Sequence, residues 1–240
     1  MNYRKKLYDV YVTTHTAGRY EVVSQTTVTG QYPVLRAYFG EFLPQNKDTR
    51  ILDLGCGSGE LVYWLRAEGY SDVGGVDISK EQLRRAEALG LGDLICEDLQ
   101  TFLSHETDKY DLIIARDVLE HFTKDELMEL LSHAHRALHP GGKIVIQTVN
   151  AANLFWGVLR YGDFTHEIAF TEASIAQVLL ASGFKNLCIR PQPPVARGLR
   201  SAVRAVAWRG VQAIIRAYFL IERGSAPRIL TQNLIVAAEK

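Results

Sequence analysis

The chain has 240 residues, of which 47% are hydrophobic and 22% are charged, and its formal net charge at pH 7 is zero. This length and composition suit one domain with one large core, and the lack of a basic excess argues against nucleic acid as a partner. The three cysteines are odd in number and have no paired spacing, which indicates neither a disulfide framework nor a zinc cluster. No apolar run approaches the length of a membrane span or of a signal sequence, so we expect a cytoplasmic protein.

Residues 1–45 precede the first predicted strand and are rich in ring-bearing side chains, namely Tyr8, Tyr11, His15, Tyr20 and Tyr32. Such side chains can stack on a ligand, but ordinary packing of a helix against the domain explains most tyrosines equally well. We select Tyr11 and His15 as candidate contacts to a substrate.

The segment 50–60, RILDLGCGSGE, joins a short apolar strand to a glycine-rich turn. Gly55, Gly57 and Gly59 lack a Cβ, so the backbone can turn sharply and bring its N–H groups close to a ligand. The pattern predicts a nucleotide-like cofactor, and a tight strand-to-helix turn without a ligand is the alternative.

Two carboxylates flank this turn, Asp53 before it and Glu60 after it. They would repel a pyrophosphate, and Glu60 stands where the dinucleotide fingerprint needs a small residue, so the pattern disfavours NAD. Residues 53–59 resemble the first motif, acidic-x-G-x-G-x-G, of the class I S-adenosylmethionine-dependent methyltransferases. S-adenosylmethionine has no phosphate and carries an ammonium and a sulfonium. The resemblance therefore implies S-adenosyl-L-methionine as cofactor and S-adenosyl-L-homocysteine as product.

Acids also follow the second and third predicted strands. Asp77 lies near the position at which doubly wound folds place a ribose-binding acid, although it could instead cap the helix that begins near Ser79. The resemblance implies that Asp98 faces the adenine amino group, and a solvated loop carboxylate is the alternative. We add the neighbours Ile78 and Leu99 to the predicted cofactor pocket.

The segment 116–122, RDVLEHF, follows the fourth predicted strand, at the edge where open α/β sheets bind their ligands. We assign Arg116 and Asp117 to the cofactor. Residues 119–121, LEH, resemble the motif after the fourth strand in ubiquinone-type O-methyltransferases and many sugar methyltransferases. That resemblance implies His121 as a candidate base, whereas a packed or capping histidine is the alternative.

A second polar cluster, YGDFTHE at 161–167, follows the fifth predicted strand and precedes a helix capped by Thr171. Its side chains could bind an acceptor hydroxyl, abstract its proton or coordinate a divalent ion, or they could belong to a solvated loop. We assign His166 and Glu167 to catalysis and Asp163 to the substrate. We name no metal ligand and leave the metal dependence open.

The stretch between the last two predicted strands, Val195–Arg223, holds six arginines and one acid, so its net charge is +5 and that of the remainder is −5. In its first half the arginines lie on one side of a helical projection and the apolar residues on the other. Three interpretations remain open: a contact with an anionic membrane surface, a site for a phosphorylated or acidic acceptor, and a dimer-forming or core-covering helix. We add Arg197 and Arg200 to the candidate substrate contacts.

Together these elements predict a doubly wound α/β fold with a seven-stranded, mostly parallel sheet. The predicted strands are Ile51–Leu54, Val73–Asp77, Asp93–Cys96, Asp111–Ala115, Lys143–Val149, Asn186–Arg190 and Leu230–Ala238. We expect one methyltransferase domain composed of an N-terminal helical lid (1–45), a cofactor-binding core (46–194), a basic helical insertion (195–229) and the last strand (230–240). The lid, and the pairing of the last two strands as a hairpin, are implied by the resemblance.

The YGDFTHE segment, the basic insertion and the final strand also resemble methyltransferases of bacterial polysaccharide and lipopolysaccharide biosynthesis. This resemblance implies O-methylation of a sugar or sugar phosphate, as a small molecule or linked to a carrier. A methyltransferase for a phenol or an amine, and a non-catalytic S-adenosylmethionine-binding protein, are the alternatives. Peripheral contact with the inner face of the membrane and a homodimer both remain open.

Overall fold

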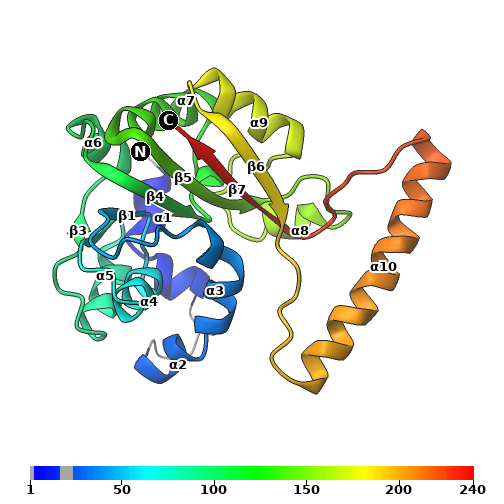
Figure 1. Cartoon of the computed structure of the whole chain (residues 1–240), viewed down its shortest axis with the longest axis horizontal. Coiled ribbons are helices and arrows are strands. Elements are labelled where there is room, and N and C mark those ends of the chain that lie inside the picture. The colour runs from blue at the N-terminus through cyan, green and yellow to red at the C-terminus, as the bar shows by residue number, and fades with distance from the viewer. Residues whose placement is uncertain (1–2, 17–23) are drawn as a thin grey trace.

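The computed structural model describes residues 3–16 and 24–240, so Tyr20 lies outside the described residues. Seven strands form one sheet in the order β3-β2-β1-β4-β5-β7-β6 (Figure 1). The first five pair in parallel and β7 is antiparallel to both β5 and β6, which confirms the predicted fold. The strands are β1 (Ile51–Leu54), β2 (Val73–Asp77), β3 (Ile95–Cys96), β4 (Tyr110–Arg116), β5 (Leu138–Val149), β6 (Lys185–Pro191) and β7 (Asn233–Glu239).

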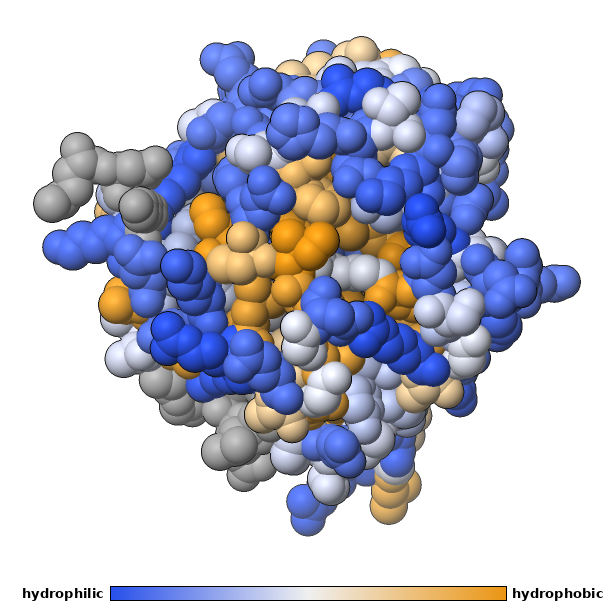
Figure 2. Space-filling view, turned by 90° about the vertical axis from the view of Figure 1, so that its left-hand side faces the viewer, coloured by the Kyte–Doolittle hydropathy of each residue, from blue (hydrophilic) through white to orange (hydrophobic). Residues whose placement is uncertain are grey.

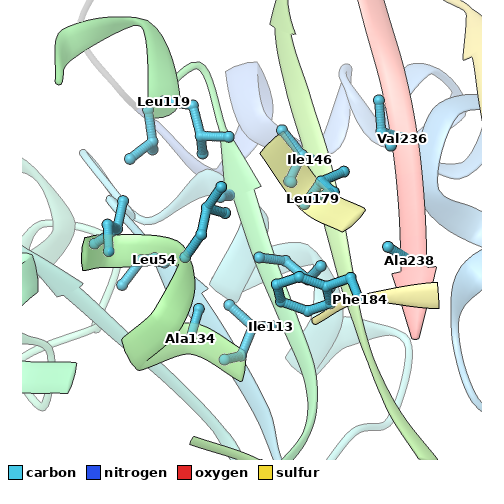
Figure 3. Close-up of a cluster of buried hydrophobic side chains, with 14 of the residues drawn as sticks. Leu54, Ile113, Leu119, Ala134, Ile146, Leu179, Phe184, Val236 and Ala238 are labelled. Atoms are coloured by element: carbon cyan, nitrogen blue, oxygen red, sulfur yellow. The ribbon is translucent and has the colours of Figure 1, made fainter. Parts of the chain in front are cut away.

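Helices cover both faces of the sheet (Figure 1). They are α1 (Tyr3–Tyr8), α2 (Gln25–Thr29), α3 (Tyr32–Phe39), α4 (Glu60–Ala67), α5 (Lys80–Glu87), α6 (Leu99–Ser104), α7 (Lys124–Ala137), α8 (Trp156–Arg160), α9 (Glu172–Ala181) and α10 (Leu199–Arg223). One core contains side chains from α6, α7 and α9, and the other contains side chains from α2, α3, α4 and α5. In Figure 3, Ala134 of α7, Leu179 of α9 and Phe184 lie against strand residues of the first core.

The alternation of side chains along β4 explains why both faces are covered. Ile113 and Ala115 belong to one core, while Leu112 and Ile114 belong to the other. Successive side chains of a strand point to opposite faces, so an unbroken apolar run is expected in a strand that is buried on both sides. Because β1 to β5 run parallel, their carboxyl ends all lie at one edge of the sheet, where ligands of such folds bind.

Three predicted strands begin two or more residues away from their observed starts. The third strand covers only Ile95–Cys96, because this short edge strand pairs with β2 at just two positions. The fifth strand begins at Leu138, directly after α7, and its pairing with β4 is irregular between Leu138 and Lys143. The last strand begins at Asn233 rather than at Leu230, although Leu230 is buried.

The stretch between β6 and β7 forms one helix of 25 residues, α10, which extends away from the sheet (Figure 1). In the part of the chain that the structure describes, no helix is long and apolar enough to cross a membrane.

Candidate active site

The glycine-rich turn has the backbone conformation that the sequence predicts. Gly55, Gly57 and Gly59 all have positive φ angles, of 77°, 55° and 76°. A Cβ on Gly55 would lie 2.5 Å from the Cγ2 atom of Val118, whereas a Cβ on Gly57 would meet nothing closer than Gln82 at 3.8 Å. Gly55 is therefore required by packing as well as by conformation, whereas at Gly57 only the positive φ angle favours glycine.

Asp77 ties this turn to the end of β2. Its Oδ2 atom accepts a hydrogen bond of 2.8 Å from the N–H of Gly57, and its Oδ1 atom accepts one of 2.7 Å from the N–H of Ser79. The N-cap of α5 is Ser79, whose hydroxyl accepts from the N–H of Gln82. Asp77 therefore holds the two loops together as an acceptor, and burial raises the pKa of its carboxyl group.

Asp98 is the N-cap of α6, because its side chain accepts from the N–H groups of Gln100 and Thr101. Leu99 is buried, whereas Ile78 and Ile95 are exposed. Figure 2 looks onto the side of the molecule that carries β3 in Figure 1 and shows apolar surface ringed by hydrophilic side chains. The residues predicted for the adenine therefore lie beside exposed apolar side chains.

Asp53, Glu60 and Arg116 bring charges of both signs to the turn. Asp53 is 2% exposed, and burial raises the pKa of its carboxyl group to about 7. Arg116 forms an ion pair of 3.2 Å with Glu60. The amino-acid end of S-adenosylmethionine carries an ammonium and a carboxylate, so carboxylates beside one guanidinium are chemically matched to it.

Asp117 and Glu120 anchor the segment after β4. Asp117 has a φ angle of 56°, and its carboxylate accepts a hydrogen bond of 2.7 Å from the side chain of Gln147 on β5. Glu120 is 1% exposed and accepts a bond of 2.9 Å from the hydroxyl of Thr148, and burial raises its pKa to about 8. The carbonyl of Glu120 also accepts from the N–H of Glu167. The first two bonds fix the segment 116–122 to β5, and the last one holds this segment beside the polar cluster at 161–167.

A chain of hydrogen bonds connects His121 to Asp163 through Thr165. The Nδ1 atom of His121 lies 2.9 Å from the hydroxyl oxygen of Thr165, and that hydroxyl donates a bond of 2.7 Å to Oδ1 of Asp163. Thr165 has one hydroxyl proton, which goes to the carboxylate, so Nδ1 of His121 must donate to Thr165. The Nε2 atom of a neutral His121 is therefore free of a proton and able to accept one.

His166 lies against His121, with the two ring centres 4.7 Å apart. Its Nδ1 atom donates a bond of 2.9 Å to the carbonyl oxygen of Leu159, which also leaves Nε2 as an acceptor when the ring is neutral. Burial lowers the pKa of both imidazoles, and that of His121 falls to about 4. Ligand atoms of His121, Asp163 and His166 lie within 4.8 Å of one another, so this cluster has the donor types that a divalent transition metal prefers.

The N-terminal segment brings Tyr11 and His15 to this cluster. The hydroxyl of Tyr11 donates a bond of 2.5 Å to Oδ2 of Asp163, and Nε2 of His15 lies 3.6 Å from the same oxygen. The N–H of Val12, the residue after Tyr11, donates to the carboxylate of Glu81 on α5. The segment therefore runs from the polar clusters to the start of α5, across the edge at which the parallel strands end.

Arg4 fixes the other end of this segment. It forms hydrogen bonds of 2.7 and 2.9 Å with Glu126 and one of 3.1 Å with Glu167. Tyr3 also donates to Glu167, and these contacts lower the pKa of the Glu167 carboxyl group. Glu167 thus binds Tyr3 and Arg4 and helps to hold the N-terminal segment in place.

Arg197 and Arg200 lie apart from the cluster. Arg197 donates to the carbonyl oxygen of Gly30, and Arg200 is exposed on α10. Thr165, Glu120 and Arg4 were not predicted. Thr165 lies inside the predicted segment 161–167 and could have been found there, whereas Arg4 gives no signal because its partners are more than 100 residues away in the chain.

Residues 25–189 match the family described as "Methyltransferase domain", and the chain belongs to this family. This family match confirms the predicted methyltransferase class, and solved S-adenosylmethionine-dependent methyltransferases share the fold. The chain is similar to a solved S-adenosylmethionine-dependent methyltransferase from Archaeoglobus fulgidus, with 20% identity and a TM-score of 0.65, over 90% of this chain and 100% of that one. It is also similar to phosphoethanolamine N-methyltransferase 2 of Haemonchus contortus, solved with S-adenosyl-L-methionine, with 16% identity and a TM-score of 0.60, over 97% and 60% of the chains.

Two curated relatives are an O- and an N-methyltransferase. The ubiquinone biosynthesis O-methyltransferase of Idiomarina loihiensis is 31% identical over 112 residues, which are 45% of each chain. The N-terminal Xaa-Pro-Lys N-methyltransferase 1-B of Xenopus laevis is 30% identical over 136 residues, 54% of this chain and 60% of the relative. The chain therefore spans about half the length of the curated relatives it matches.

Proposed function

We propose that this protein transfers a methyl group from S-adenosylmethionine to a hydroxyl oxygen of a polar, sugar-like acceptor. The observation that carries the proposal is the hydrogen-bonded series His121–Thr165–Asp163, which leaves Nε2 of His121 free to accept a proton. An alkyl hydroxyl must lose its proton as it attacks, so an acceptor of this kind benefits from a neutral imidazole at the site.

The bound cofactor would supply the methyl group on its sulfonium. The acceptor oxygen forms the new bond to the methyl carbon, and the electrons of the broken sulfur–carbon bond stay on sulfur, giving S-adenosylhomocysteine. Nε2 of His121 takes the hydroxyl proton, and Asp163 stabilises the resulting imidazolium through Thr165. Orientation of the two reactants supplies on the order of 7–11 kcal/mol of the barrier reduction, while a general base typically adds about 10²–10⁴ in rate.

The polar cluster around Asp163 supports a sugar or sugar phosphate as acceptor over a phenol. His121, Asp163, His166 and Tyr11 meet at the cluster, and each can exchange hydrogen bonds with hydroxyl groups. A phenol would be better matched to an apolar, aromatic pocket. The assignment to surface polysaccharide assembly, with a small-molecule or carrier-linked glycan as acceptor, rests on the sequence resemblance alone.

The residues predicted for the cofactor complete the proposal. We propose that Asp53, Arg116 and Asp117 bind the amino-acid end of the cofactor and that Asp77 binds the ribose. Asp98, Ile78 and Leu99 would surround the adenine, beside the exposed apolar surface at β3 (Figure 2).

The test is methyl transfer from labelled S-adenosylmethionine to matched acceptors of three kinds: sugars and sugar phosphates, phenols, and amines. We expect labelled methyl ethers from the first group, and loss of turnover in His121→Ala with unchanged cofactor affinity by calorimetry. Turnover of amines or phenols alone would refute the proposed acceptor class. Binding of S-adenosylmethionine without any transfer would favour a non-catalytic protein.

A further inference from the structure

Helix α10 is the least buried large element of the protein. It has 25 residues, of which only Ile215 is buried. The less exposed positions on its inner side recur every three or four residues, as in Ala205, Trp208, Gln212, Ile215 and Phe219. One narrow line of the helix is therefore partly covered, and the rest of its surface is exposed.

The uncovered side of α10 is apolar. Leu199, Val203, Val206, Ile214 and Ile221 are between 60% and 87% exposed. At 3.6 residues per turn they fall within a sector of about 80°, which contains no charged residue. Exposed apolar surface of this extent marks a site of interaction with a membrane or another protein.

Arginines border this sector on both sides. Arg200 and Arg204 lie along one border, Arg209 and Arg216 along the other, and the helix carries a single acid, Glu222. Among the residues that the structure describes, no ion pair joins an arginine of α10 to a carboxylate. The positive charges are thus not neutralised within the chain.

We infer that α10 docks this protein on the surface of an anionic lipid bilayer. The helix would lie in the plane of the interface, with its apolar sector at the boundary between headgroups and acyl chains and its arginines on lipid phosphates. Leucine, isoleucine and valine side chains supply the buried apolar area, and each arginine near the surface adds a favourable electrostatic contribution.

Charge complementarity favours a bilayer over a second copy of the chain. Two α10 helices that paired through their apolar sectors would bring ten arginines together with only two glutamates, and like charges that flank a helix interface oppose pairing. Anionic headgroups supply the opposite charge that a second copy lacks.

A second group of exposed apolar side chains lies next to the C-terminal end of α10. Phe219 and Arg223 line one groove together with Leu154 and Trp156, at the start of α8. The side chains of Phe155, Val158, Tyr161 and Phe164, in α8 or next to it, are also exposed. The residues Asp163 and His166 of the candidate active site belong to the same stretch. Docking through α10 would therefore keep the acceptor loop near the bilayer, on the body side of the helix and within reach of a lipid-linked acceptor; this extension rests on the proposed function, whereas membrane binding does not.

The apolar part of the inference is tested by co-sedimentation with vesicles of phosphatidylcholine, alone or mixed with phosphatidylglycerol. We expect the wild-type protein to bind the mixed vesicles and not the neutral ones. The double variant Val206→Glu/Ile214→Glu should lose this binding, because it places two carboxylates in the apolar sector. Leu180→Glu, at an exposed leucine of α9, is the matched control and should bind as the wild type does.

The electrostatic part is tested by Arg204→Glu/Arg209→Glu. Each basic residue near an anionic surface contributes roughly fivefold to partitioning, so reversal of two should weaken vesicle binding at least about 30-fold. Arg84→Glu, at an exposed arginine of α5, is the matched control. Wild-type binding should also weaken as salt is raised.

Unchanged melting temperatures and cofactor affinities would show that the α10 variants are folded, and unchanged methylation of a soluble acceptor would separate docking from the proposed chemistry. Failure of the wild type to bind mixed vesicles, or equal binding by the α10 variants, would overturn the inference. It would also be overturned if light scattering showed a wild-type dimer that Val206→Glu/Ile214→Glu converts to a monomer, without vesicle binding.

Discussion

Replacing Thr165 with valine would remove the hydroxyl that links His121 to Asp163 while nearly preserving the side-chain volume. Thr165 is 1% exposed, and its hydroxyl oxygen lies 2.9 Å from Nδ1 of His121 and 2.7 Å from Oδ1 of Asp163. The variant Thr165→Val leaves the N–H at Nδ1 of His121 without its partner. It also separates the imidazolium that forms during transfer from the carboxylate that stabilises it.

The expected effects on stability and on rate differ in size. A buried donor without a partner costs about 1–3 kcal/mol in the free energy of unfolding. A general base contributes about 10²–10⁴ to the rate, and a base that loses its orientation should retain part of this, so we expect kcat to fall about 10²-fold. Cofactor affinity should not change, because none of the Thr165 contacts described above involves the glycine-rich turn at 55–59.

Single-turnover methyl transfer at saturating cofactor measures the rate, and calorimetric titration with S-adenosylhomocysteine measures the affinity. Thr165→Ser keeps the hydroxyl and is the control, which should stay within a few-fold of the wild-type rate. A valine variant that transfers methyl groups as fast as the serine variant would refute the role assigned to the hydrogen-bonded series.

Three further outcomes are expected. Burial raises the pKa of Asp53 to about 7, and a bound ammonium favours the ionised form, so cofactor affinity should fall up to about tenfold per pH unit below 7 in titrations, and Asp53→Asn should abolish this dependence. Burial lowers the pKa of His121 from 6.5 to about 4, so the ring stays neutral through mildly acidic pH, and kcat at saturating cofactor should show no inflection near pH 6.5. Arg4→Leu removes the bonds to Glu126 and Glu167, so amide exchange in residues 3–16 should accelerate and the KM for the acceptor should rise, whereas exchange in β4 should be unchanged.

Local patterns predicted the glycine-rich turn and the two strands beside it, because their signals lie in consecutive residues. The turn at 55–59 needs glycines whatever the rest of the chain does, and β1 and β2 were predicted with their observed bounds. The N-cap role of Asp98 was missed, since an adenine contact or a solvated loop carboxylate was expected, although a capping residue before an apolar helical stretch is a local signal.

The acceptor half depends on contacts between distant residues. The bond from Tyr11 to Asp163 spans 152 positions, and that from Arg4 to Glu126 spans 122. Composition marked each of these residues as polar or aromatic, but only the packing of the N-terminal segment across the strand ends decides which pairs meet. Glu167 illustrates the difference, because a carboxylate next to a histidine suggests catalysis, whereas the fold pairs it with Tyr3 and Arg4.

The net charge of zero is the sum of two separated charges, +5 in residues 195–223 and −5 in the remainder. Helix α10 carries five of the six arginines of residues 195–223. Figure 1 shows that this helix extends away from the body. Near an anionic bilayer the helix is attracted, while acids more than about 8 Å from the surface are largely screened at physiological salt. The separation therefore both attracts the protein and orients it, with α10 against the lipid and the acidic body towards solvent. An even distribution of the same residues would do neither, so an overall charge of zero does not argue against an anionic membrane as a partner.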